Sequence, residues 1–403
     1  MRTVRIIDNE DYIVALRLHV NKRGIAAIML AHCAGMVDLV ALPVWVGTLI
    51  AFYGLDTQAA GGLPTLFLIG ASIASIVIAP RLNQLNTRLV VVIGFGIGSL
   101  LLLTSSLTHT YSVLVALHLA SGLAVGSALS VTHGTIGHCT NPHRLFGLSG
   151  LAIGILGIVF LGGAPGIINQ FGGPALFLLL SGLMAFATLA SLFFFPSTKN
   201  VMAERIADNT QAPIRPEVWF CICGIALLCT AQAMTLSFYE RLGMARGFGS
   251  GLVTLALVGY GIVAIFPSPI AALLENRFRA TMVICIGPLF QALFAMIATH
   301  SDNYIAYALS GGGMAFTILF THTFAFGLLA RLDASGRAVA GTPAMMMVGA
   351  AIGPFLGGVL VKHAGFESIG IAACLLALTQ VVLFNAMRVG IRNRGIAAPE
   401  TVK

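Results

Sequence analysis

The sequence predicts an all-α membrane protein with twelve transmembrane helices in two six-helix bundles and both termini in the cytoplasm. Continuous apolar stretches, short loops between them and one-sided positive charge indicate this class. A hydrocarbon core about 30 Å thick needs about 20 helical residues to cross it, and each stretch is about 19 to 29 residues long. Only 9% of the residues are charged and the mean hydropathy is +0.95. Such a chain has too little polar surface to be solvated by water.

The apolar stretches are continuous over lengths that favour helices, because a membrane β-barrel would alternate its faces over segments of about 10 residues. Proline and glycine inside them are compatible with membrane helices, since neighbouring helices satisfy the backbone groups that they free. The predicted spans are residues 24–52, 59–80, 89–107, 111–136, 145–168, 174–196, 217–239, 249–273, 281–299, 303–329, 338–361 and 367–388.

Positive charge predicts the orientation. Of the 22 Lys and Arg residues, all except Arg241, Arg246 and Lys362 fall on the side of the N-terminus. The positive-inside rule therefore places both termini in the cytoplasm. The net charge of +8 is explained by this topology, and no nucleic-acid partner is expected because no soluble basic domain is present.

The residues before the first span carry several charges and no uninterrupted apolar core. We therefore expect residues 1–23 to form a cytoplasmic tail, with an interfacial helix over 12–20 as the alternative, and the first span to act as the insertion signal. Short loops and uncleaved insertion suit a multi-pass protein of a prokaryotic inner membrane. The seven cysteines lack zinc spacing, so we expect packing roles, no metal and no cofactor.

The longest internal loop divides the chain into two halves. Phe52 and Tyr53 end the first span as Phe238 and Tyr239 end the seventh, and Pro165 in span five corresponds to Pro354 in span eleven. These echoes indicate a duplication, with a substrate path between the halves. The predicted division is a bundle over 24–196, a cytoplasmic linker over 197–216, a second bundle over 217–388 and a cytoplasmic tail over 389–403.

Two local patterns accompany this organisation. The loop after span two carries Asn83 and Arg88, and the corresponding loop of the second half carries Glu275 and Arg277. Span eleven carries a glycine-rich run with Gly353, Pro354, Gly357 and Gly358, and span five a looser copy. Glycine at every fourth residue leaves one helix face as bare backbone, so a neighbouring helix can approach closely, and the proline bends the helix.

The organisation and these patterns resemble the major facilitator superfamily across essentially the whole chain. The resemblance implies a binding site near the bilayer midplane and alternating access by rocking of the two halves. In that family an aspartate at the position of Asn83 forms charged contacts that hold one conformation closed; Asn83 can form a hydrogen bond but no ion pair. In the corresponding loop of the second half, Glu275 and Arg277 retain the charged side chains of this family pattern. The glycine-proline run resembles an element that usually marks span five of proton-coupled exporters, although here the better copy lies in span eleven.

Asp38 stands near the middle of the first span, and no other acid lies as deep in a span. A charged group in the membrane costs at least about 2.5 kcal/mol, so it is kept for a reason. We expect Asp38 to bind a proton or a cation; a structural hydrogen bond to a neighbouring helix is the alternative.

His118 in span four is the predicted partner of Asp38. It occupies the position at which the family resemblance places an arginine that lines one cavity with a span-one aspartate. A histidine has an ordinary pKa of about 6.5, so it can exchange a proton near neutrality where an arginine cannot. Direct or water-mediated contact with Asp38 and a satisfied interhelical histidine both remain open.

Further polar, aromatic and sulfur-containing side chains inside the spans are candidates for lining a substrate cavity, with ordinary helix packing as the alternative for each. Gln291 is expected to be structural, because span nine usually packs on the outside of this fold. The predicted cavity residues are Trp45, Gln232, Tyr260, His322 and Met345.

No Lys or Arg lies deep inside a span, which disfavours an anionic substrate. The leading prediction is a monomeric secondary transporter that exports a small, neutral or cationic, fairly apolar organic solute in exchange for protons. An importer or uniporter of a small metabolite and a non-transporting membrane sensor are the alternatives. An enzyme is not expected, because the loops are short and hold no metal-ligand cluster, phosphate-binding loop or hydrolase-like spacing.

Overall fold

The computed structural model describes residues 18, 20–140, 142–197, 215–275, 277–332 and 342–393. Predictions for the tail before residue 18, for most of the linker and for the segment after residue 393 lie outside this range. Within it the chain is helical, and twelve helical segments are long and apolar enough to cross a membrane. The predicted all-α class with twelve spans is therefore confirmed, whereas the cytoplasmic placement of the termini stays a prediction.

The helices follow the predicted spans closely. They are α2 (Lys22–Tyr53), α3 (Thr57–Ile78), the short 3-10 helix η1 (Ala79–Gln84), α4 (Thr87–Ser105), α5 (Tyr111–His138), α6 (Pro142–Phe171), α7 (Pro174–Phe194), α8 (Pro216–Ala245), α9 (Gly249–Val263), α10 (Pro267–Leu274), α11 (Ala280–His300), α12 (Tyr304–Leu332), α14 (Thr342–Ala364) and α15 (Glu367–Asn393).

Three of these boundaries differ from the prediction in ways that matter. The eighth span is two helices, α9 and α10, because Pro267 has no N–H to continue the first and starts the second instead. The last helix continues to Asn393, beyond the predicted end of the last span at 388 and into the predicted C-terminal tail. Helix α8 runs to Ala245 rather than 239, which places Glu240 inside a helix.

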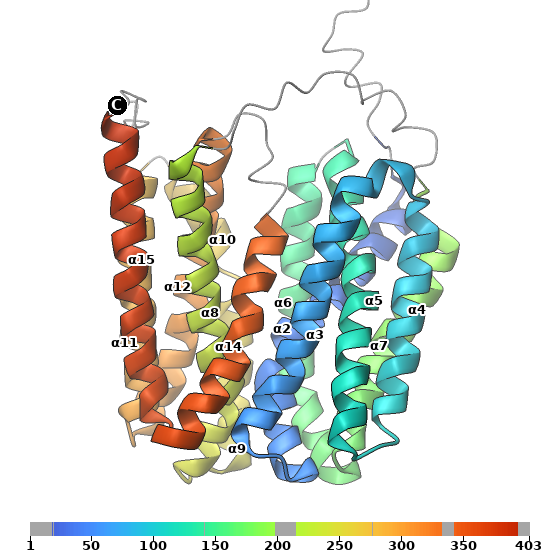
Figure 1. The fold of residues 1–403 in the computed structure, drawn as a ribbon, viewed down its shortest axis with the longest axis horizontal. Coiled ribbons are helices and arrows are strands. Elements are labelled where there is room, and N and C mark those ends of the chain that lie inside the picture. Colours follow the sequence, from blue (N-terminus) through green and yellow to red (C-terminus); the bar gives the residue numbers. More distant parts are fainter. Residues whose placement is uncertain are drawn as a thin grey trace, which may run out of the picture.

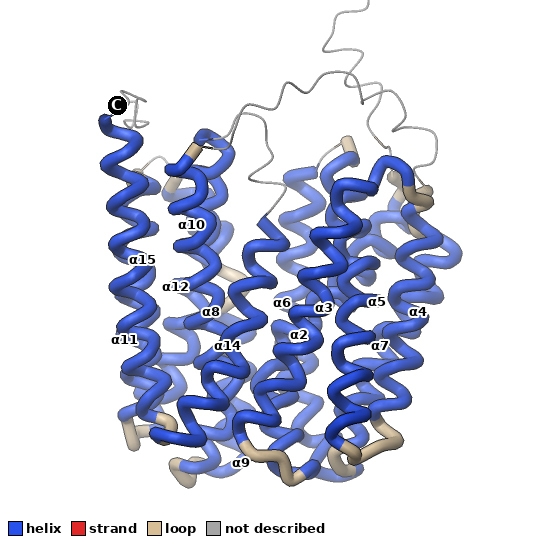
Figure 2. The backbone as a smooth tube through the Cα atoms, in the orientation of Figure 1, coloured by secondary structure: helices blue, strands red, loops and turns tan. Residues whose placement is uncertain are grey.

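Figure 1 shows helices α2 to α7 on the right and the helices from α8 onward on the left, and Figure 2 shows the short loops that join them. Across the middle, α3 packs against α14, α2 against α8, and α6 against α9. We call the end of the molecule at which α2 begins, at Lys22, the near face, and the end at which it finishes, at Tyr53, the far face.

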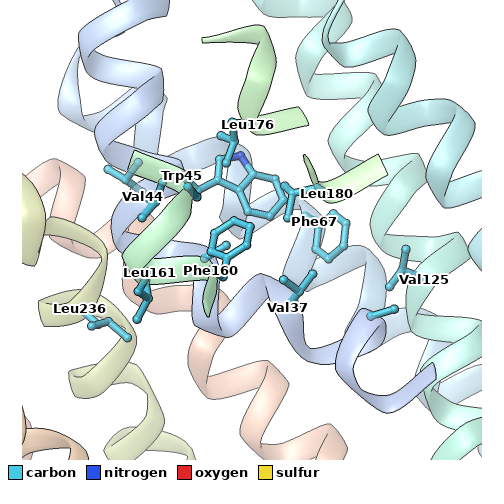
Figure 3. Close-up of a cluster of buried hydrophobic side chains, with 14 of the residues drawn as sticks. Val37, Val44, Trp45, Phe67, Val125, Phe160, Leu161, Leu176, Leu180 and Leu236 are labelled. Atoms are coloured by element: carbon cyan, nitrogen blue, oxygen red, sulfur yellow. The ribbon is translucent and has the colours of Figure 1, made fainter. Parts of the chain in front are cut away.

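The apolar core is continuous across both groups of helices. Its largest cluster includes Trp45 and Phe67 from the first half together with Leu236 from the second, and Figure 3 shows these side chains with Phe160 and Leu161. Because lipid is as apolar as this core, the approach of the helices is driven by close packing and hydrogen bonds rather than by exclusion of water.

The α3–α14 seam is closed at the far face. The Lys362 ammonium lies 2.9 Å from the Asp56 carboxylate, and the Thr57 hydroxyl donates to the Gly358 carbonyl at 3.0 Å. Deeper in the seam, the Thr65 hydroxyl donates to the Ala351 carbonyl at 2.6 Å. These contacts join the two halves directly, so they must break if the halves separate at this end.

Asp56 gives the closed α3–α14 seam a weak dependence on pH. The backbone N–H of Ala59 and the Lys362 ammonium hold the pKa of Asp56 below its usual range. A lowered pKa stabilises the fold above the unfolded value of about 3.9, and this contribution is lost as the pH falls through the folded value. Because the side chain is 51% exposed, solvent screening limits the contribution to less than about 1 kcal/mol.

We therefore expect Asp56→Asn to lower the unfolding temperature slightly at pH 7, and the difference from the wild type to shrink as the pH falls below about 3.9. Asparagine caps a helix about as well as aspartate, so the substitution isolates the charge. Thermal unfolding of the purified protein at pH 7 and at a pH below about 3.9 measures the difference. An equal difference at both would show that the charge of Asp56 is not involved.

Candidate functional site

Asp38 is buried in the first half. Its side chain is 2% exposed, and neither carboxylate oxygen accepts a hydrogen bond from any described residue. An ion removed from water without a partner costs several kcal/mol. Such a carboxyl group is stable only with a proton on it, or with a cation or hydrogen-bond donor supplied from outside the chain.

The neighbours of α2 show where Asp38 points. Residues three, four and seven apart share a helix face. Seven residues beyond Asp38, the Trp45 ring lies 5.5 Å from the His118 ring; three residues before it, Gly35 packs against Leu129. His118 and Leu129 both belong to α5, whereas Leu42, four residues beyond Asp38, clusters with Leu68, Ala233 and Ala350. The face of α2 that carries Asp38 therefore borders both α5 and the second half. Between His118 and Leu129, α5 carries Ser121, whose buried hydroxyl also has no hydrogen-bond partner among the described residues.

His118 is fully buried and oriented by its own helix. Its Nδ1 lies 2.7 Å from the Leu114 carbonyl oxygen, which can only accept, so Nδ1 carries the hydrogen. The neutral ring therefore presents Nε2 as a proton acceptor. Nε2 is buried and has no partner in the described part of the chain. Both members of the predicted pair thus hold free proton-binding atoms.

The structure does not bring Asp38 and His118 into direct contact. His118 packs against Trp45 and Phe177, with ring centroids 5.5 and 5.4 Å apart. Trp45 lies two turns beyond Asp38, about 10.5 Å along the axis at 1.5 Å per residue. Trp45 itself is 1% exposed and packs against Phe67, His118 and Phe177, so in this conformation it is part of the aromatic core of the first half.

In the second half, the predicted cavity residues Gln232 and Tyr260 lie together. The Gln232 amide nitrogen lies 2.8 Å from the Tyr260 hydroxyl, and Gln291 donates to the Gln232 carbonyl oxygen at 3.0 Å. Gln291, expected to be structural, thereby joins α11 to a polar chain that continues through α8 to α9. This chain orients the Gln232 amide within the second half.

His322 and Met345 are also buried in the second half. The His322 Nε2 lies 3.4 Å from the Cys229 sulfur, and its ring stacks on Phe326 with centroids 5.4 Å apart. Met345 belongs to an apolar cluster that includes Cys229 and Phe384. In the conformation described, both side chains pack between helices.

A cavity lies between the two halves at the far face. It has a volume of about 260 Å³ and is lined by the last turns of α2, α6 and α8 and the first turns of α9. None of the five predicted cavity residues lines it. Its charged groups are Glu240 and Arg241, and its wall includes Gly47, Thr48 and Asn169.

Sequence reasoning missed Glu240 because it placed the end of span seven at residue 239. The signal that could have found it is the continuation of helix-compatible residues to Ala245, without glycine or proline in the first three positions after Tyr239. One carboxylate oxygen of Glu240 is buried without a hydrogen-bond partner among the described residues. Glu240 is therefore a partly buried acid with one buried carboxylate oxygen, and it lies at the boundary between the halves, against Gly47 of α2.

The loop after α3 makes contacts inside the first half. Asn83 lies in η1, and its side chain is outside the described part. Arg88 donates through Nε to the Phe195 carbonyl at 2.6 Å, which ties the start of α4 to the end of α7. Glu275 and Arg277 of the second half are exposed, so a charged latch at this loop stays a prediction.

The glycine-rich run of α14 is a two-sided packing surface. Gly353 and Gly357 face Met234 of α8, whereas Pro354 and Gly358 face Gly61 and Thr57 of α3. Helix α14 is therefore held by one face in the second half and by the other against the first half. This placement fits a helix about which the halves move, and that role remains a proposal.

Twelve helical segments long and apolar enough to cross a membrane, in two packed groups with a cavity between them, are typical of a secondary transporter. The chain belongs to the Major Facilitator Superfamily, whose model matches residues 27–332. It is therefore a multi-pass membrane transporter of small molecules rather than an enzyme.

Two comparisons agree with this assignment. The chain is 23% identical over 374 residues to the purine ribonucleoside efflux pump NepI of Shigella dysenteriae serotype 1 (strain Sd197), covering 89% of this chain and 93% of that protein. The crystal structure of a point mutant of the nucleoside transporter NupG superposes with a TM-score of 0.69 at 15% identity, covering 91% of this chain and 99% of the other. At this identity the structural match shows the fold.

Proposed function

We propose that this transporter exports a small, neutral or cationic, fairly apolar organic solute in exchange for protons. The burial of Asp38 supports the proposal most directly: the residue is 2% exposed, and its carboxylate lacks a partner among the described residues. A proton satisfies this group when no solute is bound. The arriving solute supplies a donor or positive charge instead, and the proton is released.

Purine ribonucleosides are the first substrates to test, because the relative named above is a purine ribonucleoside efflux pump. They are neutral, with apolar ring faces and several hydrogen-bond donors. The lack of deep Lys or Arg in the spans supports a solute without negative charge.

In this proposal, His118 tunes the proton affinity of Asp38 through α5, which borders the face of α2 that carries Asp38. The two side chains are not in contact in this conformation, so their coupling requires movement or water between the helices. Trp45, Gln232, Tyr260, His322 and Met345 would line the path in other conformations.

The orientation is part of the proposal. One-sided positive charge supports cytoplasmic termini, which makes the near face cytoplasmic and the far face external, with the monomer in a prokaryotic inner membrane. The cavity that contains Glu240 would then open toward the outside, at the exit end of an export path.

The wild-type chain in proteoliposomes tests the proposal. With inosine inside oriented vesicles, an imposed pH gradient should drive inosine movement, and inosine movement should carry protons the opposite way. Flux of inosine that moves no protons would contradict the coupling and favour a uniporter. Saturable binding without flux would indicate a sensor.

A further inference from the structure

The cavity at the far face lies between helices of both halves, as a substrate path between rocking bundles requires. At about 260 Å³ it is slightly smaller than the pockets of about 300 to 1,000 Å³ that enclose whole drug-sized ligands. It therefore suits one ring of a solute rather than the whole molecule.

The position of the Glu240 side chain depends on Gly47. A methyl group at Gly47 would overlap the Glu240 carboxylate, so the bare backbone of α2 is what admits the carboxylate. Another side chain at this position would push the acid away from the boundary between α2 and α8.

The cavity needs a hydrogen-bond donor at Glu240. One carboxylate oxygen is buried and unpartnered among the described residues. Thr48 also lines the cavity, but its hydroxyl donates to the Val44 carbonyl of its own helix at 2.7 Å. The Glu240 carboxylate thus forms part of the cavity wall, and its buried oxygen, which lies against Gly47, still lacks a donor among the described residues.

The other polar groups favour a neutral, hydroxyl-bearing ligand over an amine. Arg241 in the same wall balances the charge of Glu240, which lowers the attraction for a cation. Asn169, Ser250 and Thr254 add hydrogen-bonding groups around an apolar lining that includes Phe52. A hydroxyl on a small ring can donate to a carboxylate, which only accepts.

We propose that this cavity is an external subsite that binds the sugar hydroxyls of a nucleoside-like solute, with Glu240 as the acceptor and Gly47 as the residue that admits it. The inference rests on the proposed function for its substrate class. It adds a second acid to the path, at the far face, whose role is solute recognition.

Binding to the purified full-length chain tests this subsite with inosine and 2′,3′-dideoxyinosine, which lacks the two hydroxyls. The wild type should bind inosine about tenfold or more tightly than the dideoxy compound, because hydrogen bonds to charged groups are worth about 1.5 to 3 kcal/mol. Glu240→Gln should weaken inosine binding by a similar factor and leave the dideoxy compound unaffected. The preference for the hydroxyls should therefore collapse.

Gly47→Ala provides a second variant and should also reduce the preference for inosine, because its methyl group displaces the carboxylate. Glu367→Gln is the matched control: it removes an acid that pairs with Arg246 at 2.9 Å, outside the cavity. Thermal unfolding checks that each variant is folded.

Unchanged inosine affinity in Glu240→Gln, or an equal loss for both compounds, overturns the subsite and leaves the proton-coupled export at Asp38 standing. A wild-type chain that binds no inosine overturns both the subsite and the proposed substrate class.

Discussion

Replacing Asp38 with asparagine should abolish proton-driven transport without unfolding the protein. The amide has nearly the shape of the carboxyl group but cannot bind and release a proton. We expect the flux driven by a pH gradient in proteoliposomes to fall at least about 100-fold, which corresponds to an increase of about 2.7 kcal/mol in the activation free energy. The unfolding temperature should stay the same or rise, because an unpartnered buried acid is removed.

Asp302→Asn is the matched control for this result. Asp302 is an exposed partner of Arg246 at the far face, so its loss should leave pH-driven flux near the wild-type level. If Asp38→Asn kept its pH-driven flux, proton coupling would have to be assigned elsewhere. If it lost its fold, Asp38 would be a structural hydrogen-bonding residue.

A methyl group at Gly61 should have the second largest effect. Gly61 of α3 faces the Pro354 carbonyl of α14, and an added Cβ would overlap that backbone. Alanine is favoured over glycine in a helix by about 1 kcal/mol. Any loss of transport must therefore arise because α3 can no longer pack closely against α14. We expect Gly61→Ala to slow transport about tenfold and to raise the reactivity of a cysteine introduced at Gln58.

The neighbouring glycine offers a close control. A Cβ at Gly62 would lie 3.7 Å from the Tyr111 hydroxyl and 3.8 Å from Phe355, which are ordinary contacts. Gly62→Ala should therefore transport like the wild type and leave the reactivity of the introduced cysteine at the wild-type level. Equal activity of the two alanine variants would show that closure of the α3–α14 seam does not limit transport.

The helices were well predicted because a segment that crosses the bilayer must be both apolar and about 20 residues long, and both properties can be read from the sequence. Deviations occur where local chemistry overrides them: Pro267 divides the eighth span, and α8 continues past the aromatic pair Phe238 and Tyr239. The close packing of α14 was predictable from Gly353 and Pro354, although periodicity does not reveal which helix each face meets.

The site was predictable only in part. Asp38 stood out because charge deep in a span is costly, and the structure buries it without a partner among the described residues. Its relation to His118 was not predictable from depth alone, because the rotation of α2 directs Trp45 onto His118 instead. Glu240 was missed because a carboxylate near a helix end is normally expected to be solvated. The sequence does not reveal that Gly47 of α2 lies opposite this carboxylate and leaves room for it.

Proton release on solute binding is the most direct test of the central claim that solute and proton compete for Asp38. The purified wild-type chain in weakly buffered detergent solution, followed with a pH indicator, should release about one proton per chain when inosine saturates it. Asp38→Asn should bind inosine and release none. Saturation of the wild type without proton release, or equal release by the Asp38→Asn variant, would contradict the account.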